Sequence, residues 1–213
     1  GVEVGRDRLR VGVGDEGKAK VLAYFVSAAI QNLPSRVDSQ YKPILVERFQ
    51  GGGNAGHTVV VGGVEYKLKT VPSGILFPHT YNLMGQKTFV DPRLTIKEVK
   101  ELREKGVYIN PNDNVGIAAN AHVTLDYHLF DDQIIFNSEK RTSTGSGIKQ
   151  TAVDKQGRVG IRFIEFLDSK LMKEVLQERF PQGLPEQFGS FDEFVAIYDP
   201  EREFLKDFAF REQ

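Results

Sequence analysis

The sequence predicts an α/β fold, with a central, mostly parallel sheet, flanking helices, a P-loop-like phosphate turn and a β-hairpin. Three observations favour it. Segments rich in β-forming residues alternate with segments of helical periodicity. A glycine-rich turn, GVGDEGK (12–18), follows a short apolar run. Two β-rich runs flank Gly62-Gly63, a pair typical of a hairpin turn.

The first elements follow in chain order. RLRVG (8–12) reads as a short strand that runs into the glycine turn, although its two arginines are unusual for a central parallel strand. Residues 18–33 carry apolar side chains at helical spacing, and Pro34 ends that pattern. A second strand is predicted over 42–49, and the hairpin over 57–71.

The next elements are a strand over 81–91 and a helix over 91–106. The helix has the clearest boundaries, because Asp91 suits the N-cap, Pro92 the first helical position and Gly106 the C-terminal turn. The charges in KEVKELREKG (97–106) are expected to form its solvated face.

The remaining pattern gives a strand over 115–125, a polar, glycine-bearing loop over 139–160 and an amphipathic helix over 163–180. The last part is rich in phenylalanine and is expected to form core or an interface. Its phenylalanines include Phe188, Phe191, Phe194, Phe204, Phe208 and Phe210.

Composition limits the class of protein. The chain has 213 residues, a net charge of −1 and 40% hydrophobic residues, which predicts one globular α/β domain over 1–213 and no nucleic-acid partner. It lacks cysteine, which fits a reducing compartment, and it lacks an apolar run of about 18 residues, so no membrane partner is expected. A cytoplasmic protein is therefore predicted.

The first motif matches the spacing G-x-x-x-x-G-K of a phosphate-binding loop through Gly12, Gly17 and Lys18. Backbone N–H groups of such a turn point at an anion, and the lysine adds a full charge. Ala19 stands where these loops carry a Ser or Thr that holds Mg²⁺. A plain strand-to-helix turn with solvated charges is the alternative for this stretch alone.

Asp15 is a candidate to bind the metal ion in place of the missing hydroxyl. A carboxylate inside a phosphate loop repels phosphate unless a metal ion lies between them, and Mg²⁺ commonly takes one or two carboxylates together with phosphate oxygens. The sequence therefore predicts that Asp15 is a magnesium ligand within the loop.

The second motif is RFQGGGNAGHTVV (48–60), a glycine turn between two predicted strands that carries Asn54 and His57. A lone histidine usually makes a structural hydrogen bond. A glycine loop around it and a candidate phosphate loop upstream favour a functional role instead. Because phosphoryl transfer depends on positioning and electrostatics, Asp15, Lys18 and His57 are predicted to act together.

GDEGKAK (14–20) followed by QGGGNAGHTVV (50–60) resembles the adenylosuccinate synthetase family, which reads GDEGKGK and then QGG-x-NAGHT. Further segments match family motifs in the same order, and the resemblance covers about residues 11–162, leaving 163–213 as an unassigned helical, Phe-rich tail. These segments are VPSGIL (71–76), FVDP (89–92), AHVTLDYHLFDD (121–132), STGSGI (143–148) and DKQGRVGIR (154–162).

The resemblance implies GTP-dependent ligation of IMP and aspartate to adenylosuccinate in purine biosynthesis. IMP is phosphorylated on O6, and aspartate then displaces the phosphate. The resemblance implies that Asp15 is the base that takes the N1 proton and also a Mg²⁺ ligand. His57 would be the acid or hydrogen-bond donor, Lys18 would neutralise phosphate, and the Gly56 carbonyl would bind Mg²⁺.

The resemblance also implies two binding sets and a partner. The GTP-binding set is Gly14, Asp15, Glu16, Gly17, Lys18, Ala19, Lys20, Gly56, His57 and Thr58. The IMP-binding set is Asp15, Asn54, Ala55, Gly56, His57, Thr144 and Arg158. Arg158 aligns with an arginine that reaches the IMP phosphate of the neighbouring subunit, which implies a homodimer.

The match has departures. Gly12-Val13 replaces a Gln-Trp pair, Ser146 replaces an arginine, and Lys149 and Gln150 replace a glycine and a proline. The chain is also truncated relative to the family, since the half with the aspartate loop and the guanine-reading motif has no counterpart here.

Three explanations fit this length: a fragment of a full enzyme, a short relative that works as a subunit of a split enzyme, or a non-catalytic purine-nucleotide-binding module. Asp15 and His57 occur together, which favours chemistry. A general P-loop NTPase is disfavoured, since Glu47 is a weak candidate for its second acid. The related branch that acts on dGMP lacks the catalytic aspartate. His79, His122 and His128 lack zinc-site spacing and are expected to be structural.

Overall fold

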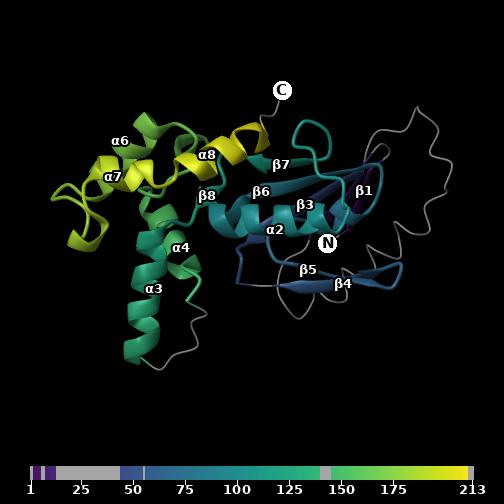
Figure 1. Cartoon of the computed structure of the whole chain (residues 1–213), viewed down its shortest axis with the longest axis horizontal. Coiled ribbons are helices and arrows are strands. Elements are labelled where there is room, and N and C mark those ends of the chain that lie inside the picture. Colours follow the sequence, from purple (N-terminus) through teal and green to yellow (C-terminus); the bar gives the residue numbers. More distant parts are fainter. Residues whose placement is uncertain (1, 6–7, 13–43, 55, 140–144, 211–213) are drawn as a thin grey trace.

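The computed structural model describes residues 2–5, 8–12, 44–54, 56–139 and 145–210. Within these residues a seven-stranded sheet has the order β1-β2-β3-β6-β7-β9, and β8 pairs with β6 (Figure 1). Its strands are β1 (Val2–Gly5), β2 (Arg8–Gly12), β3 (Ile44–Gly51), β6 (Thr80–Val90), β7 (Val115–Ala118), β8 (His122–Val123) and β9 (Ala209–Phe210).

The pairing confirms a mostly parallel sheet. Only the β1–β2 pair is antiparallel among the described strand pairs of this sheet, while β2–β3, β3–β6, β6–β7, β6–β8 and β7–β9 are parallel. The sequence did not predict β1. The structure places the arginine-bearing β2 second from the edge of the sheet rather than at its centre.

The predicted hairpin is confirmed as a separate two-stranded sheet of β4 (His57–Val61) and β5 (Val64–Leu68). Gly62 and Gly63 join the strands with φ values of 58° and 82°. Two consecutive left-handed residues are what a two-residue hairpin turn requires, and glycine adopts them at no steric cost.

The helices gather in two places. Helix α2 runs along the sheet, whereas α3, α4, α6 and α7 lie together at one end of the molecule (Figure 1). The helical elements are η1 (Ser73–Leu76), α2 (Pro92–Glu104), α3 (Asp126–Glu139), α4 (Ile148–Gly157), α5 (Phe163–Phe166), α6 (Ser169–Arg179), η2 (Glu186–Phe188), α7 (Phe191–Ala196), α8 (Asp199–Leu205) and η3 (Lys206–Phe208).

The boundaries of α2 are as predicted. The Asp91 carboxylate accepts the N–H of Leu94 at 3.0 Å, Pro92 is the first helical residue, and Gly106 follows the helix with φ of 82°. The prediction for its charged residues was wrong at Glu98, which is only 5% exposed.

The predicted loop over 139–160 was wrong over Ile148–Gly157, which form helix α4, and its residues 140–144 lie outside the described residues. The buried residues of α4 are Thr151 and Asp154, which are both polar. Hydrogen bonds to neighbouring elements hold this helix, so no apolar periodicity marks it in the sequence. Helix α3 was likewise not predicted.

Two other predicted elements are divided. The helix over 163–180 becomes α5 and α6, because the Asp168 carboxylate accepts the N–H groups of Lys170 and Leu171 and starts a new helix. The strand over 115–125 becomes β7 and β8, because the chain turns where the N–H of Ala121 donates to the carbonyl of Ala118.

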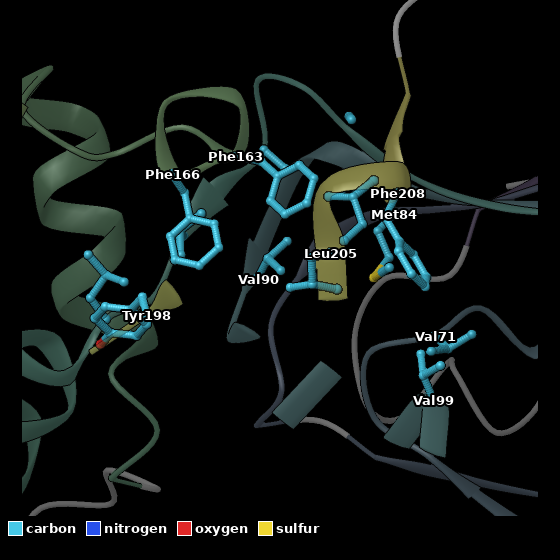
Figure 2. Packing of buried hydrophobic residues seen from close by; sticks show 14 of the residues in the cluster. Val71, Met84, Val90, Val99, Phe163, Phe166, Tyr198, Leu205 and Phe208 are labelled. Carbon is cyan, nitrogen blue, oxygen red and sulfur yellow. The ribbon is translucent and has the colours of Figure 1, made fainter. Parts of the chain in front are cut away.

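One hydrophobic core joins the sheet to the C-terminal helices. Figure 2 shows Phe163, Phe166 and Tyr198 packed around the region of Val90 and Leu205. Within the Phe-rich tail, Phe194 and Phe208 are buried, and Phe188, Phe191 and Phe204 pack against the core, so the expectation that this segment forms core is confirmed. No helix of the described residues is long and apolar enough to span a membrane.

Candidate active site

The second glycine motif forms the turn between β3 and β4. Strand β3 ends at Gly51, which has φ of 93°, and β4 begins at His57. Strand β2, parallel to β3, ends at Gly12, opposite Glu47. The two glycine motifs therefore start at the carboxyl ends of neighbouring parallel strands, which is where open α/β sheets bind ligands.

Close packing explains two glycines of this turn. A Cβ atom on Gly52 would lie 2.0 Å from Cδ1 of Ile148, and one on Gly53 would lie 2.2 Å from Cδ2 of Leu94. A larger residue at either position would require the side chain of Ile148 or Leu94 to shift. The turn thus contacts the first residue of α4 and the first turn of α2, so the structure brings the second glycine motif to the STGSGI segment.

Glu98 of α2 holds the chain that follows β5. Its two carboxylate oxygens accept the N–H groups of Lys69, Thr70 and Val71 and the hydroxyl of Thr70, at 2.8 to 3.1 Å. Burial raises the pKa of Glu98, and the four donors oppose that effect.

The contacts of Glu98 affect His57 through the pairing of β4 with β5. Leu68, immediately before the segment held by Glu98, pairs with His57 across the hairpin. The Lys69 side chain passes close to Gly56, where its Cγ would lie 3.4 Å from an added Cβ. Glu98 therefore fixes the backbone that carries the histidine and places a lysine beside the turn.

His57 is partly buried, and its Nε2 atom is buried without a hydrogen-bond partner in the described part of the chain. Burial, together with the positive charge of Arg48, lowers the pKa of His57 to about 4. At neutral pH the imidazole is therefore uncharged and can donate one N–H. Because a buried polar atom normally has a partner, this nitrogen is a candidate to bond a polar group of a ligand.

Arg48 places a positive charge next to the glycine turn. Its Nη2 donates to the carbonyl oxygen of Gly52 at 2.6 Å. Burial lowers the pKa of Arg48 while the Glu98 carboxylate opposes this, and a guanidinium remains charged at neutral pH. A fixed positive charge next to a glycine turn suits an anionic ligand.

The STGSGI segment is held from α3. The N–H of Gly147 donates to Oδ2 of Asp132 at 3.0 Å. Gly147 has φ of 69°, and a Cβ there would lie 2.9 Å from Cγ2 of Thr124. These contacts fix the start of α4 against the AHVTLDYHLFDD segment.

Arg158 lies at the opposite end of α4. It is exposed and has φ of 60°, an uncommon conformation for a residue other than glycine. Ten helical residues rise about 15 Å, so Arg158 is well removed from the glycine turn, which contacts the first residue of α4. The structure does not bring Arg158 to the cluster around His57.

The other histidines differ in role. In His128, Nδ1 accepts the N–H of Leu125 at 2.9 Å and Nε2 lies 3.3 Å from Oδ2 of Asp154, so the predicted structural role is confirmed. His122 is partly buried and His79 is exposed. Among the described residues no group of three or more His, Cys, Asp or Glu side chains could hold a metal ion.

Apart from Arg158, the predicted site residues divide into two groups. Asn54, Gly56, His57 and Thr58 lie on or beside the one turn. The others, apart from Arg158, lie outside the described residues: Gly14, Asp15, Glu16, Gly17, Lys18, Ala19, Lys20, Ala55 and Thr144. The same holds for the predicted helix over 18–33.

Sequence reasoning missed Glu98, Arg48 and Lys69. A signal for Glu98 existed, because the buried residues of α2 recur at helical spacing and Glu98 occupies one of those positions beside Val99. Arg48 and Lys69 carry no such signal, since their roles depend on how the turn folds back.

Comparison with known proteins agrees with these motifs. The family model for adenylosuccinate synthetase matches residues 11–206. The adenylosuccinate synthetase of Lacticaseibacillus casei is 36% identical over 189 residues, which are 87% of this chain and 38% of the relative. That of Bacillus thuringiensis is 37% identical over 172 residues, or 79% of this chain and 36% of the relative.

Solved structures share the fold. A fully ligated adenylosuccinate synthetase from Plasmodium falciparum matches with a TM-score of 0.63 and 21% identity, covering 94% of this chain and 46% of that one. The succinoaminodeoxyadenylate synthetase of cyanophage S-2L, bound to dGMP and dATP, matches with a TM-score of 0.53 and 20% identity, covering 81% and 48%. This chain spans less than half the length of these relatives, and it belongs to the adenylosuccinate synthetase family.

Proposed function

We propose that this chain carries the phosphoryl-transfer part of a GTP-dependent adenylosuccinate synthetase. In this reaction O6 of IMP attacks the γ-phosphorus of GTP and releases GDP. The amine of aspartate then attacks C6 and displaces phosphate. The observation that carries the proposal is the turn at the carboxyl end of β3, where Nε2 of His57 has no hydrogen-bond partner among the described residues and lies near the charge of Arg48.

His57 is proposed to stabilise charge on the transferring phosphoryl group and on O6. Its pKa of about 4 makes it a neutral hydrogen-bond donor before ligands bind. Donors fixed in advance at the position where charge develops are the main source of rate enhancement in such reactions. Asp15 is proposed as the base that takes the N1 proton, and Lys18 as the cation on the GTP phosphates.

Mg²⁺ is proposed to be held by the Asp15 carboxylate and the Gly56 carbonyl. A carboxylate and a carbonyl are oxygen donors of the type that Mg²⁺ prefers, so this pair fits the ion. When bound, the ion would neutralise negative charge between the phosphates. Asn54, Ala55 and Thr144 are proposed to contact IMP, and Thr58 the phosphates of GTP.

Arg158 is proposed to act across a homodimer, on the IMP phosphate of the neighbouring subunit. Two observations support this: the residue is exposed, and it lies at the end of α4 far from its own glycine turn. A cytoplasmic location is proposed with this function.

A second candidate follows from length. The chain spans 38% of the Lacticaseibacillus casei relative, so a nucleotide-binding module or one subunit of a split enzyme is the alternative. In either case the chain would bind IMP or GTP without forming adenylosuccinate by itself.

Turnover separates these functions. The protein is incubated with IMP, GTP, Mg²⁺ and aspartate, and adenylosuccinate and GDP are measured by mass spectrometry. Adenylosuccinate is the expected product of a complete site, and GDP alone would show a half-reaction, with the aspartate pocket absent from this chain or held by a partner. Nucleotide binding with neither product would favour the binding module.

Asp15→Asn is the matched variant for the base. It is expected to abolish product while nucleotide binding remains measurable by calorimetry. Normal turnover by this variant would show that Asp15 is not the base. Replacing IMP with dGMP tests for the activity of the related branch, and no product is expected from dGMP.

A further inference from the structure

Asp154 of α4 is buried, at 3% exposure, and receives three side chains from two other helices. Its Oδ2 accepts the hydroxyl of Tyr127 at 3.2 Å and lies 3.3 Å from Nε2 of His128. Its Oδ1 accepts Nε of Arg179, from α6, at 3.0 Å. The mechanism proposed above uses none of these four side chains, although three of them lie in motifs shared with the family.

The hydrogen-bond pattern fixes how His128 is protonated. Its Nδ1 accepts the N–H of Leu125 at 2.9 Å, so the ring proton is on Nε2 and is donated to Asp154. Burial opposes ionisation of Asp154, but the bonds from His128 and Arg179 outweigh it and hold the pKa of this carboxyl below its usual value. Asp154 is therefore an ionised group that cannot rotate away from its partners without leaving donors unpaired.

The backbone of the same residue ends the helix. The carbonyl oxygen of Asp154 accepts the N–H groups of Val159 and Gly160 at 3.0 and 3.1 Å, and Arg158 also caps the helix through Asp154 and Lys155. These bonds close the turn in which Arg158 adopts φ of 60°. Within the described part of the chain, no hydrogen bond or ion pair holds the Arg158 side chain itself, so its direction depends on this turn.

The other end of α4 has separate anchors. Thr151 is 2.9 Å from Thr124 between hydroxyl oxygens, and Gly147 is bonded to Asp132. Loss of the Asp154 contacts should therefore leave the start of α4 in place and free only its end.

From this geometry we infer that Asp154 is a positioning residue. Its hydrogen bonds with Tyr127, His128 and Arg179 hold the left-handed turn in place, and this turn directs the Arg158 side chain out of its own subunit. The inference deepens the proposed function and, for the part that concerns IMP, rests on it. The ligand group that Arg158 would meet is a phosphate monoester, which a guanidinium binds through two parallel hydrogen bonds.

The first experiment does not depend on turnover. Amide hydrogen exchange is measured by NMR or mass spectrometry for Val159 and Gly160 in the full chain, its Asp154→Asn variant and its Asp168→Asn variant. Asp154→Asn puts an NH₂ group against a donor, and we expect exchange at both amides to accelerate by about tenfold or more. Asp168→Asn weakens the N-cap of α6 without touching the cluster, so exchange at these amides should not change.

The second experiment is a double-mutant cycle on the active protein. Asp154→Asn is expected to raise KM for IMP about tenfold while kcat and KM for GTP change less than about twofold. In an Arg158→Ala background, Asp154→Asn should have no further effect on KM for IMP, because the residue acts through Arg158. Arg179→Gln, which keeps Asp154, should reproduce the effect in weaker form and replaces Asp154→Asn if that variant does not fold.

The outcomes are distinct. Unchanged exchange at Val159 and Gly160 in Asp154→Asn would overturn the inference whether or not the protein is active. Accelerated exchange with additive effects on KM would show that Asp154 holds the turn but not Arg158, and would also overturn it. Accelerated exchange in a protein that makes neither GDP nor adenylosuccinate from IMP, GTP and aspartate would support the positioning role and reject the proposed function alone.

Discussion

Glu98 and Asp154 are two buried carboxylates that organise two regions in different ways. Glu98 receives backbone N–H groups and one hydroxyl beside the hairpin, whereas Asp154 receives Tyr127, His128 and Arg179 between the helices. Burial raises the pKa of Glu98, but charged and polar partners lower that of Asp154. Glu98 therefore fixes a stretch of backbone, while Asp154 fixes the relative placement of three helices.

One of the contacts between the two regions lies at the glycine turn. Gly52 of the turn lies against Ile148, the first residue of α4. Glu98 therefore acts on the side of the contact that carries His57, and Asp154 on the side that carries Arg158. Substitutions on either side test whether the regions are independent.

The largest effect is expected at Glu98. Glu98→Ala leaves three backbone N–H groups of the 69–71 segment without their acceptor, and should lower the free energy of unfolding by about 3 to 5 kcal/mol. Urea denaturation measures it. Glu101→Ala is the matched control, since Glu101 is exposed on the same helix and its removal should cost less than about 0.5 kcal/mol. A loss below about 1 kcal/mol at Glu98 would mean that water replaces the carboxylate, and the comparison would then fail.

The contact between the regions should give the next largest effect. Gly52→Ala places a methyl group where Cδ1 of Ile148 lies 2.0 Å away, so the variant should lose about 1 to 3 kcal/mol of stability. Ile148→Val removes that Cδ1 atom, and the double variant should recover most of the loss. Gly157→Ala is the control, because its nearest neighbour would lie at 3.5 Å. An additive double variant would show that the regions do not press on one another at this point.

Arg179 tests the charged side of the comparison. Arg179→Gln should cost about 1 to 2 kcal/mol at pH 7, since it removes a charge-assisted bond to a carboxylate that is 4% exposed. Lys173→Gln is the matched control: both cations are 34% exposed, but the partner of Lys173 is 79% exposed. Its removal should cost less than about 0.5 kcal/mol.

The sign of the pH dependence follows from the lowered pKa of Asp154. The ionised carboxylate contributes stability above its unfolded pKa of 3.8, and this contribution is lost as the pH falls through the lower folded pKa. The difference between wild type and Arg179→Gln should therefore shrink below about pH 4, as followed by thermal unfolding across pH. A constant difference would show that Arg179 acts by packing.

The sequence predicted one of these regions much better than the other. The hairpin, β3, β6 and α2 follow from Gly62-Gly63, from β-forming runs and from Asp91 with Pro92, because local preferences and tertiary structure agree there. The motif spacing also identified the turn that carries His57 and the family to which the chain belongs.

The region around Asp154 was predicted poorly for a physical reason. Helix α4 buries Thr151 and Asp154 instead of apolar residues, so it reads as a polar loop until its partners on α3 and α6 are known. Asp168 divides a periodic segment into two helices through its cap. Polar networks depend on residues far apart in the chain, and no local pattern encodes them.

The smallest effect is expected from the histidines, which differ between the two regions. His57 has a pKa of about 4 from burial and the charge of Arg48, whereas His128 has its pKa lowered by burial against the opposing effect of Asp154. His57 is neutral in the folded state and takes up a proton near pH 6.5 when unfolded, so it costs stability as the pH falls from 6.5 toward 4. Because the ring is partly exposed, we expect a cost of about 1 kcal/mol at pH 5 relative to pH 7, roughly half of the full linkage value.

His57→Gln should flatten the stability curve by this amount in urea denaturation. His79→Asn is the control, since it removes an exposed histidine and keeps a residue that tolerates its φ of 62°. An unchanged slope in His57→Gln would show that water reaches Nε2, and the turn would then lack the dry, neutral donor that distinguishes it from the helical region.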